Sequence, residues 1–195
     1  MRLLGKIAYT GLAFAALGTV PALAHTGVPG HVHTGLTAGI LHPLTGIDHM
    51  LAILAVGFWS ALAFKKSTHV AAAPFAFVIA MLAGAGLSFL GSGFPFAETG
   101  IALSVAALGL LILAKVELSV ATGCCLVGLF ALCHGYAHGA EASGAVGAYM
   151  AGFAITTAML HVAGIGLSRA LTKVRLAAPA IGAGLTVAGA YLLAS

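Results

Sequence analysis

Apolar residues fill most of this chain in long stretches that are separated by short polar connections. Six such stretches lie at 43–64, 70–90, 97–114, 118–138, 144–168 and 176–194. Each is close to the ~20 residues that an α-helix needs to cross a bilayer. The pattern therefore predicts an all-α fold, a polytopic membrane bundle of six transmembrane helices.

The first 24 residues show a different pattern. Arg2 and Lys6 precede the apolar run "IAYTGLAFAALGTV", and the small residues "ALA" follow at 22–24. This order is typical of a cleavable secretory signal peptide. We expect cleavage after Ala24, which leaves residues 25–195 as one transmembrane domain with a short outer tail. A retained first membrane helix is the alternative.

Charge is scarce, and its distribution predicts an orientation. Only 6% of the residues are charged, against about 25% in a soluble domain, so we expect a lipid-facing surface. The basic residues of the connections fall in alternate loops, and the positive-inside rule places such loops in the cytoplasm. They are Lys65, Lys66, Lys115, Arg169, Lys173 and Arg175. We therefore expect a bacterial inner-membrane protein with its N terminus outside, and no nucleic-acid partner.

The first apolar stretch opens with the polar segment "HPLTGIDHM", residues 42–50. Because proline favours the first turn of a helix and disfavours helical geometry just before it, we expect the helix to begin at Pro43. His42 would then lie at the outer mouth, with Asp48 and His49 ~8 Å further along the helix. Asp48 could be a metal ligand or could orient a neighbouring histidine.

The fourth stretch ends with a second polar segment, "LCHGYAHGAE". His134 and His138 are four residues apart, and Glu141 follows three residues later, so all three share one helical face. In the expected topology both segments lie in the outer half of the bilayer, where ionisable residues usually mark a pathway or site. Together they offer six candidate ligands for a transition metal: His42, Asp48, His49, His134, His138 and Glu141. A hydrogen-bond network without metal is the alternative.

Other histidines and one cysteine are weaker candidates. His25 would combine an α-amine with its imidazole after signal cleavage, and His161 lies deeper, in the fifth stretch. His161 is either a ligand on the exit side or a packed core residue. Cys133 adjoins His134 but points about 100° away from it on a helix, so we expect it to pack rather than to bind metal.

The two polar segments resemble the motifs of a known family. "HPLTGIDHMLAILAVGFWSA" is similar to the HPxxGxDHxLxxxxVGxW motif of the HupE/UreJ family, and "CHGYAHGAE" is similar to its HGxAHGxE motif. The resemblance implies a nickel permease, in some members a cobalt permease, associated with hydrogenase or urease maturation. It also implies that the six candidate ligands form the metal route.

The resemblance favours transport without a prosthetic group over catalysis, with Ni²⁺ as cargo and Co²⁺ or Zn²⁺ as alternatives. The main rival is a membrane-embedded zinc hydrolase. Such an enzyme needs an open coordination position, a bound water and a nearby acid or base, and Asp48 or Glu141 could serve.

Overall fold

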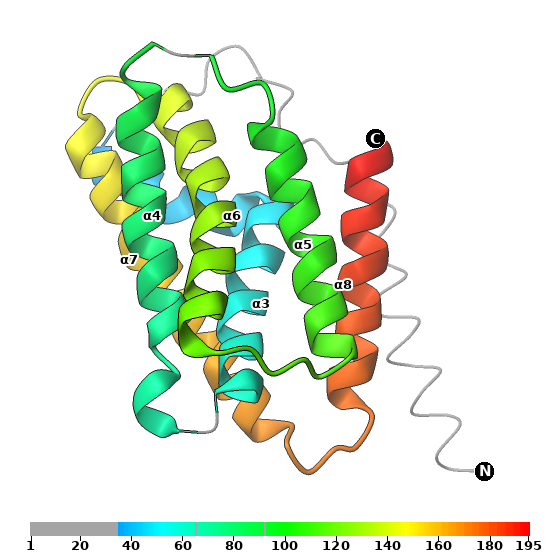
Figure 1. Ribbon diagram of the computed structural model, residues 1–195. Coiled ribbons are helices and arrows are strands. Elements are labelled where there is room, and N and C mark those ends of the chain that lie inside the picture. Colours follow the sequence, from blue (N-terminus) through cyan, green and yellow to red (C-terminus); the bar gives the residue numbers. More distant parts are fainter. Residues whose placement is uncertain (1–34, 65, 92) are drawn as a thin grey trace.

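The structure, a computed structural model, describes residues 35–64, 66–91 and 93–195, and all of its regular elements are helices (Figure 1). The predicted signal peptide and His25 lie outside the described residues. The helices are α2 (Gly35–Thr45), α3 (Ile47–Ala63), α4 (Ala72–Ser88), α5 (Ala97–Leu113), α6 (Val120–Glu141), α7 (Val146–Ala170) and α8 (Ala177–Ala194), with the short 3-10 helix η1 (Ser67–His69) before α4.

The predicted all-α fold is confirmed. Helices α3 to α8 fall one in each of the six expected stretches, and the first stretch also holds the end of α2. Four helical segments are long and apolar enough to cross a membrane: Ser67–Ser88, Val120–Glu141, Val146–Ala170 and Ala177–Ala194. The bent pair α2 and α3 is a fifth candidate, and α5 is apolar but has only 17 residues. The described residues therefore contain four to five candidate spans.

The expectation that the first helix begins at Pro43 is wrong. Pro43 lies inside α2, and the chain breaks at Gly46, whose extended backbone (φ −83°, ψ 109°) leads into α3 after a bend of 81°. Side-chain donors satisfy the carbonyls near the proline: Thr156 Oγ1 donates to Ile40 O at 2.9 Å, and Thr45 Oγ1 donates to His42 O at 2.9 Å.

Tertiary packing explains why a helix precedes this proline. A Cβ at Gly39 of α2 would run into the backbone carbonyl of Tyr149 on α7, and one at Gly152 of α7 would run into that of Leu36. The two backbones therefore touch directly through their glycines, as small residues allow in membrane proteins. This docking on α7 holds α2 in place and overrides the local preference of the residue before proline.

Helix α3 lies at the centre of the bundle. It packs against α7 and α5 most extensively, and against α2, α4 and α8. Its buried residues occur all around the helix, as expected for a helix enclosed by others, and they include Asp48, His49 and Trp59. Near its far end Trp59 Nε1 donates to Val116 O at 3.1 Å, and Ser60 Oγ donates to Val70 O, which ties α3 to both neighbouring connections.

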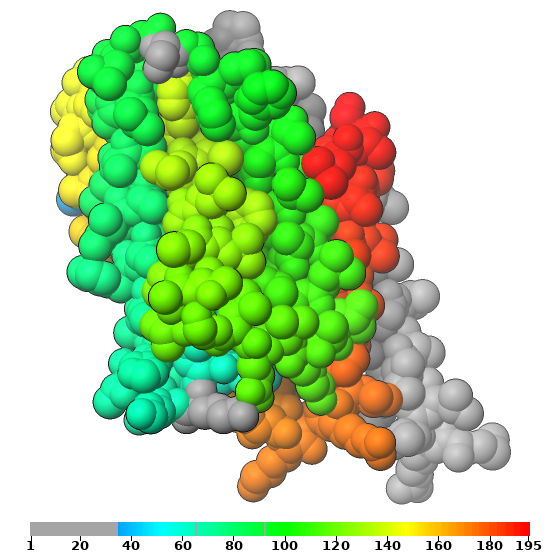
Figure 2. Space-filling model, in the orientation of Figure 1, coloured from blue at the N-terminus to red at the C-terminus, as the bar shows by residue number. Residues whose placement is uncertain are grey.

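The connections divide between the two ends of the bundle (Figure 1). The loops after α3, α5 and α7 share one end and carry Lys66, Lys115 and Lys173; the loops after α4 and α6 share the other. The sides carry many exposed apolar side chains, among them Phe75, Val162 and Val187. Figure 2 shows the face formed by α4, α6, α5 and α8. These features agree with a bundle whose sides face lipid.

Candidate metal centre

The bend between α2 and α3 turns His42 toward α6. Its ring centroid lies 4.7 Å from that of His138 and 6.4 Å from that of His49. Along one straight helix His42 and His49 would lie two turns apart, about 10 Å. The break at Gly46 shortens that separation and lets the two residues approach the same partner helix from different directions.

Helix α6 supplies the opposite side of the cluster. Its His134 and His138 are 1% and 0% exposed, and both approach the His49 ring of α3. The ring of His49 lies 4.3 Å from that of His138 and 5.0 Å from that of His134, measured between centroids. The prediction that the two polar segments come together is confirmed, and four imidazoles form one continuous group.

The two carboxylates occupy different places. Asp48 Oδ1 accepts from His49 Nδ1 at 2.8 Å, so Asp48 stands behind that imidazole and orients it. When the Nδ1–H bond goes to the carboxylate, the lone pair remains on His49 Nε2, the arrangement that metal-binding histidines commonly use. The structure thus places Asp48 as an orienting partner of His49.

Glu141 lies at the rim, where its side chain is 33% exposed. Its Oε2 is 3.6 Å from His42 Nε2 and 3.8 Å from His138 Nδ1. One ligand atom each from His42, His138 and Glu141 lie within 4.8 Å of one another, a spacing that one metal ion could bridge. A small closure would be needed, because metal–ligand bonds to nitrogen and oxygen are about 2 Å long.

Ser104 of α5 is a site residue that the sequence motifs did not reveal. Its Oγ lies 3.1 Å from His134 Nε2 and donates its hydrogen to Ile101 O at 2.6 Å. The serine oxygen therefore accepts from Nε2–H, which leaves a lone pair on His134 Nδ1 for a cation. The available signal was a serine inside the apolar stretch "IALSVAAL".

Aromatic rings wall the cluster. Phe153 of α7 lies 4.1 Å from His138 and 6.0 Å from His42, and Phe77 of α4 lies 5.4 Å from His134, between ring centroids. Tyr149 is buried 6.0 Å from His42. Nothing in the local sequence distinguishes these rings from ordinary apolar residues of a membrane helix, so their role could not be predicted.

Cys133 packs as predicted. It is 8% exposed, lies in an apolar cluster with Ala97, Ile101 and Ala137, and directs its Sγ to Leu129 O at 3.7 Å. His161 is buried as well and contacts Phe77, with 5.1 Å between the two ring centroids. Neither residue belongs to the group of four imidazoles.

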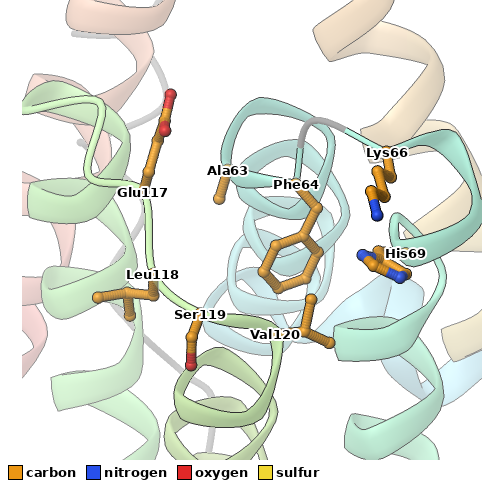
Figure 3. A pocket seen from close by; sticks show the side chains of 8 residues that line it. All are labelled: Ala63, Phe64, Lys66, His69, Glu117, Leu118, Ser119 and Val120. Atoms are coloured by element: carbon orange, nitrogen blue, oxygen red, sulfur yellow. The ribbon is translucent and has the colours of Figure 1, made fainter.

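A separate pocket of about 270 Å³ opens at the opposite end of the bundle. Phe64 lies in its middle, with Lys66 and His69 on one side and Glu117 on the other (Figure 3). The pocket lies at the basic end, far along α3 from the imidazole cluster. Its mixed lining does not resemble a metal centre.

The comparisons with known proteins identify the family. Residues 12–192 match the family described as "HupE / UreJ protein". The chain is also 42% identical over 189 residues to "Protein HupE" of Rhizobium leguminosarum bv. viciae, with 94% of this chain and 95% of the relative covered. No match to a solved structure was found.

Proposed function

Because this chain belongs to the HupE/UreJ family, we propose that it is a secondary permease that carries Ni²⁺ into the cytoplasm, with Co²⁺ as the second candidate cargo. The observation that carries the proposal is the convergence of His42 with the buried His49, His134 and His138 on one group, with Glu141 at its rim. Imidazole is a suitable ligand for Ni²⁺, and a carboxylate offsets part of the ion's charge.

We propose the following topology. The signal peptide is removed after Ala24, six helices (α3 to α8) span the bacterial inner membrane, and the N terminus lies outside. The basic loops at one end of the bundle support this orientation, since such loops favour the cytoplasm. The imidazole cluster then opens toward the outer side.

The two tiers of the cluster support a capture step followed by inward transfer. His42, His138 and Glu141 form the outer group, and the partly exposed Glu141 side chain gives an arriving cation its first contact. His49 and His134 lie next to His138, each held by one hydrogen bond in the orientation that leaves a nitrogen lone pair. The ion can exchange one imidazole for the next without returning to water.

The membrane potential can supply the driving force. A divalent cation that moves inward gains ~4.6 kcal/mol per 100 mV, since each elementary charge is worth ~2.3 kcal/mol. The cargo is a substrate, and transport by this scheme needs no prosthetic group. A hydrogenase or urease maturation system is the proposed consumer of the metal, because the family is associated with those systems.

The test is uptake of radioactive Ni²⁺ and Co²⁺ into proteoliposomes that hold the purified protein, with a membrane potential that is negative inside the vesicles. We expect potential-dependent uptake that His138→Ala abolishes. His69→Ala is the matched control, since that histidine lies at the opposite end by the separate pocket. Absence of uptake for both ions in correctly folded, oriented protein would contradict the proposal.

A further inference from the structure

His161 is a buried imidazole that does not belong to the group of four imidazoles formed by His42, His49, His134 and His138. It lies in α7, is 1% exposed, and neither of its ring nitrogens has a hydrogen-bond partner among residues 35–64, 66–91 and 93–195. A buried polar group without a partner costs free energy. Two free nitrogens at one histidine in the middle of a membrane bundle indicate a position that a ligand could occupy.

His161 is joined to the group of four imidazoles through a shared neighbour, Phe77. The Phe77 ring contacts both His134 and His161, with centroid distances of 5.4 Å and 5.1 Å. One turn before His161 on α7, Thr157 Oγ1 lies 3.9 Å from Met81 Sδ of α4. The facing sides of α4 and α7 therefore carry an imidazole beside Phe77 and, one helical turn away, a hydroxyl beside a thioether.

Helix α3 closes this region from behind. A Cβ at Gly57 would run into the backbone carbonyl of His161, and one at Gly164 would run into that of Leu54. Close backbone contact leaves no room for α3 to contribute a side chain at Gly57. The one ring contact of His161 that the described residues show is with Phe77 of α4.

We infer that His161 is the principal ligand of a second, inner cation station, which receives the transported divalent ion from His134 past the Phe77 ring. Its imidazole suits a borderline divalent ion, and the Met81 thioether and Thr157 hydroxyl are weaker donors one helical turn away. A station that binds weakly suits conduction, which requires sites that an ion can leave. This inference rests on the proposed transport function.

The test compares His161→Leu with His161→Met in the same proteoliposomes, with uptake rate measured against Ni²⁺ concentration. Leu and Met have similar volume, but only Met retains a donor atom. We expect His161→Leu to lower the maximal rate about tenfold or more, a change equivalent to 1.4 kcal/mol in a barrier. The half-saturating concentration should stay close to that of the unmodified protein, because the outer group sets it.

His161→Met should recover a several-fold higher maximal rate than His161→Leu. If His161 only packs the core, the two variants will behave alike, and equal rates would overturn the inner station. An unmodified protein that carries neither Ni²⁺ nor Co²⁺ would instead overturn the proposed function, so the two failures are distinguishable.

A second measurement covers the case in which neither variant folds. Cadmium NMR of the unmodified protein, saturated with Cd²⁺ in detergent, should show two bound-ion resonances, and His138→Ala should remove one of them. A single resonance in the unmodified protein would refute the inner station.

Discussion

At the scale of single residues, the site depends on which nitrogen each imidazole presents. Asp48 and Ser104 each bond one nitrogen of a histidine and leave the other for a cation. His134 and Cys133 are neighbours in sequence, yet one faces the imidazoles and the other an apolar cluster between α5 and α6. Adjacent positions on a helix differ by about 100° in direction. His134 can therefore belong to the candidate metal site while its neighbour Cys133 only packs.

Ser104→Ala should weaken metal binding without unfolding the protein. His134 would lose the partner that fixes its tautomer, and loss of such a partner typically costs 10- to 100-fold in metal affinity. We expect the half-saturating Ni²⁺ concentration in proteoliposome uptake to rise by roughly tenfold. Ser88→Ala is the matched control, since that hydroxyl also bonds a carbonyl of its own helix, Ala85 O at 2.7 Å. Equal effects of the two substitutions would argue against the orienting role of Ser104.

His134→Ala and Cys133→Ala should differ strongly despite their adjacency. The first removes an imidazole of the cluster, and we expect most uptake to be lost. The second removes a sulfur that faces Leu129 and Ala137, so most uptake should remain. The check is initial uptake rate normalised to the amount of folded protein. A Cys133→Ala protein as inactive as His134→Ala would make the thiolate a ligand candidate.

At the scale of helices, glycines set how closely the ligand-bearing elements approach. A Cβ at Gly135 of α6 would run into the backbone carbonyl of Met81 on α4, and Gly84 of α4 meets Leu132 in the same way. Not every glycine has this function, because a Cβ added at Gly86 would meet nothing within 4 Å. Spacing in the sequence alone does not distinguish the two cases.

Gly135→Ala should destabilise the bundle and disturb the neighbouring His134. Overpacking of a tight contact typically costs about 1–3 kcal/mol, and here the obstacle is backbone that cannot rotate away. We expect a lower melting temperature in detergent than for the unmodified protein. Gly86→Ala on α4 is the control and should leave the melting temperature unchanged or slightly higher, because alanine is the better helix former. A Gly135→Ala protein as stable as the control would show that α4 and α6 can separate freely.

At the scale of the whole molecule, the two ends of the bundle differ in charge and in the position of the imidazole cluster. The acidic rim residue Glu141 lies at the end opposite to the basic loops, and the imidazoles follow inward from it. The proposed route from the rim to His161 would pass through buried residues of the bundle. In the proposed orientation a cation moves from an acidic entrance toward a basic cytoplasmic surface.

Transport should weaken as the outer solution becomes acidic. A protonated imidazole cannot bind a metal, so protons compete with the cation for the outer histidines. Free imidazole has a pKa of about 6.5, and we expect the half-saturating metal concentration to rise as the outer pH falls from about 7.5 to about 5.5. The measurement is uptake against metal concentration at each pH. Proton coupling would act on the maximal rate instead, so a half-saturating concentration that stays flat or falls would count against histidine ligation at the entrance.

The helical fold and the residues of the outer cluster could be predicted from the amino-acid sequence. Long apolar stretches leave the backbone no partner but itself in lipid, so each stretch must be a helix. Ionisable residues are costly there, so the histidines, Asp48 and Glu141 stand out without any structure. The break at Gly46, the orienting bond of Ser104 and the contact of His161 with Phe77 became visible only in three dimensions. These features depend on which helices are in contact. Contacts between segments far apart in the sequence arise from tertiary packing, which a local sequence pattern does not predict.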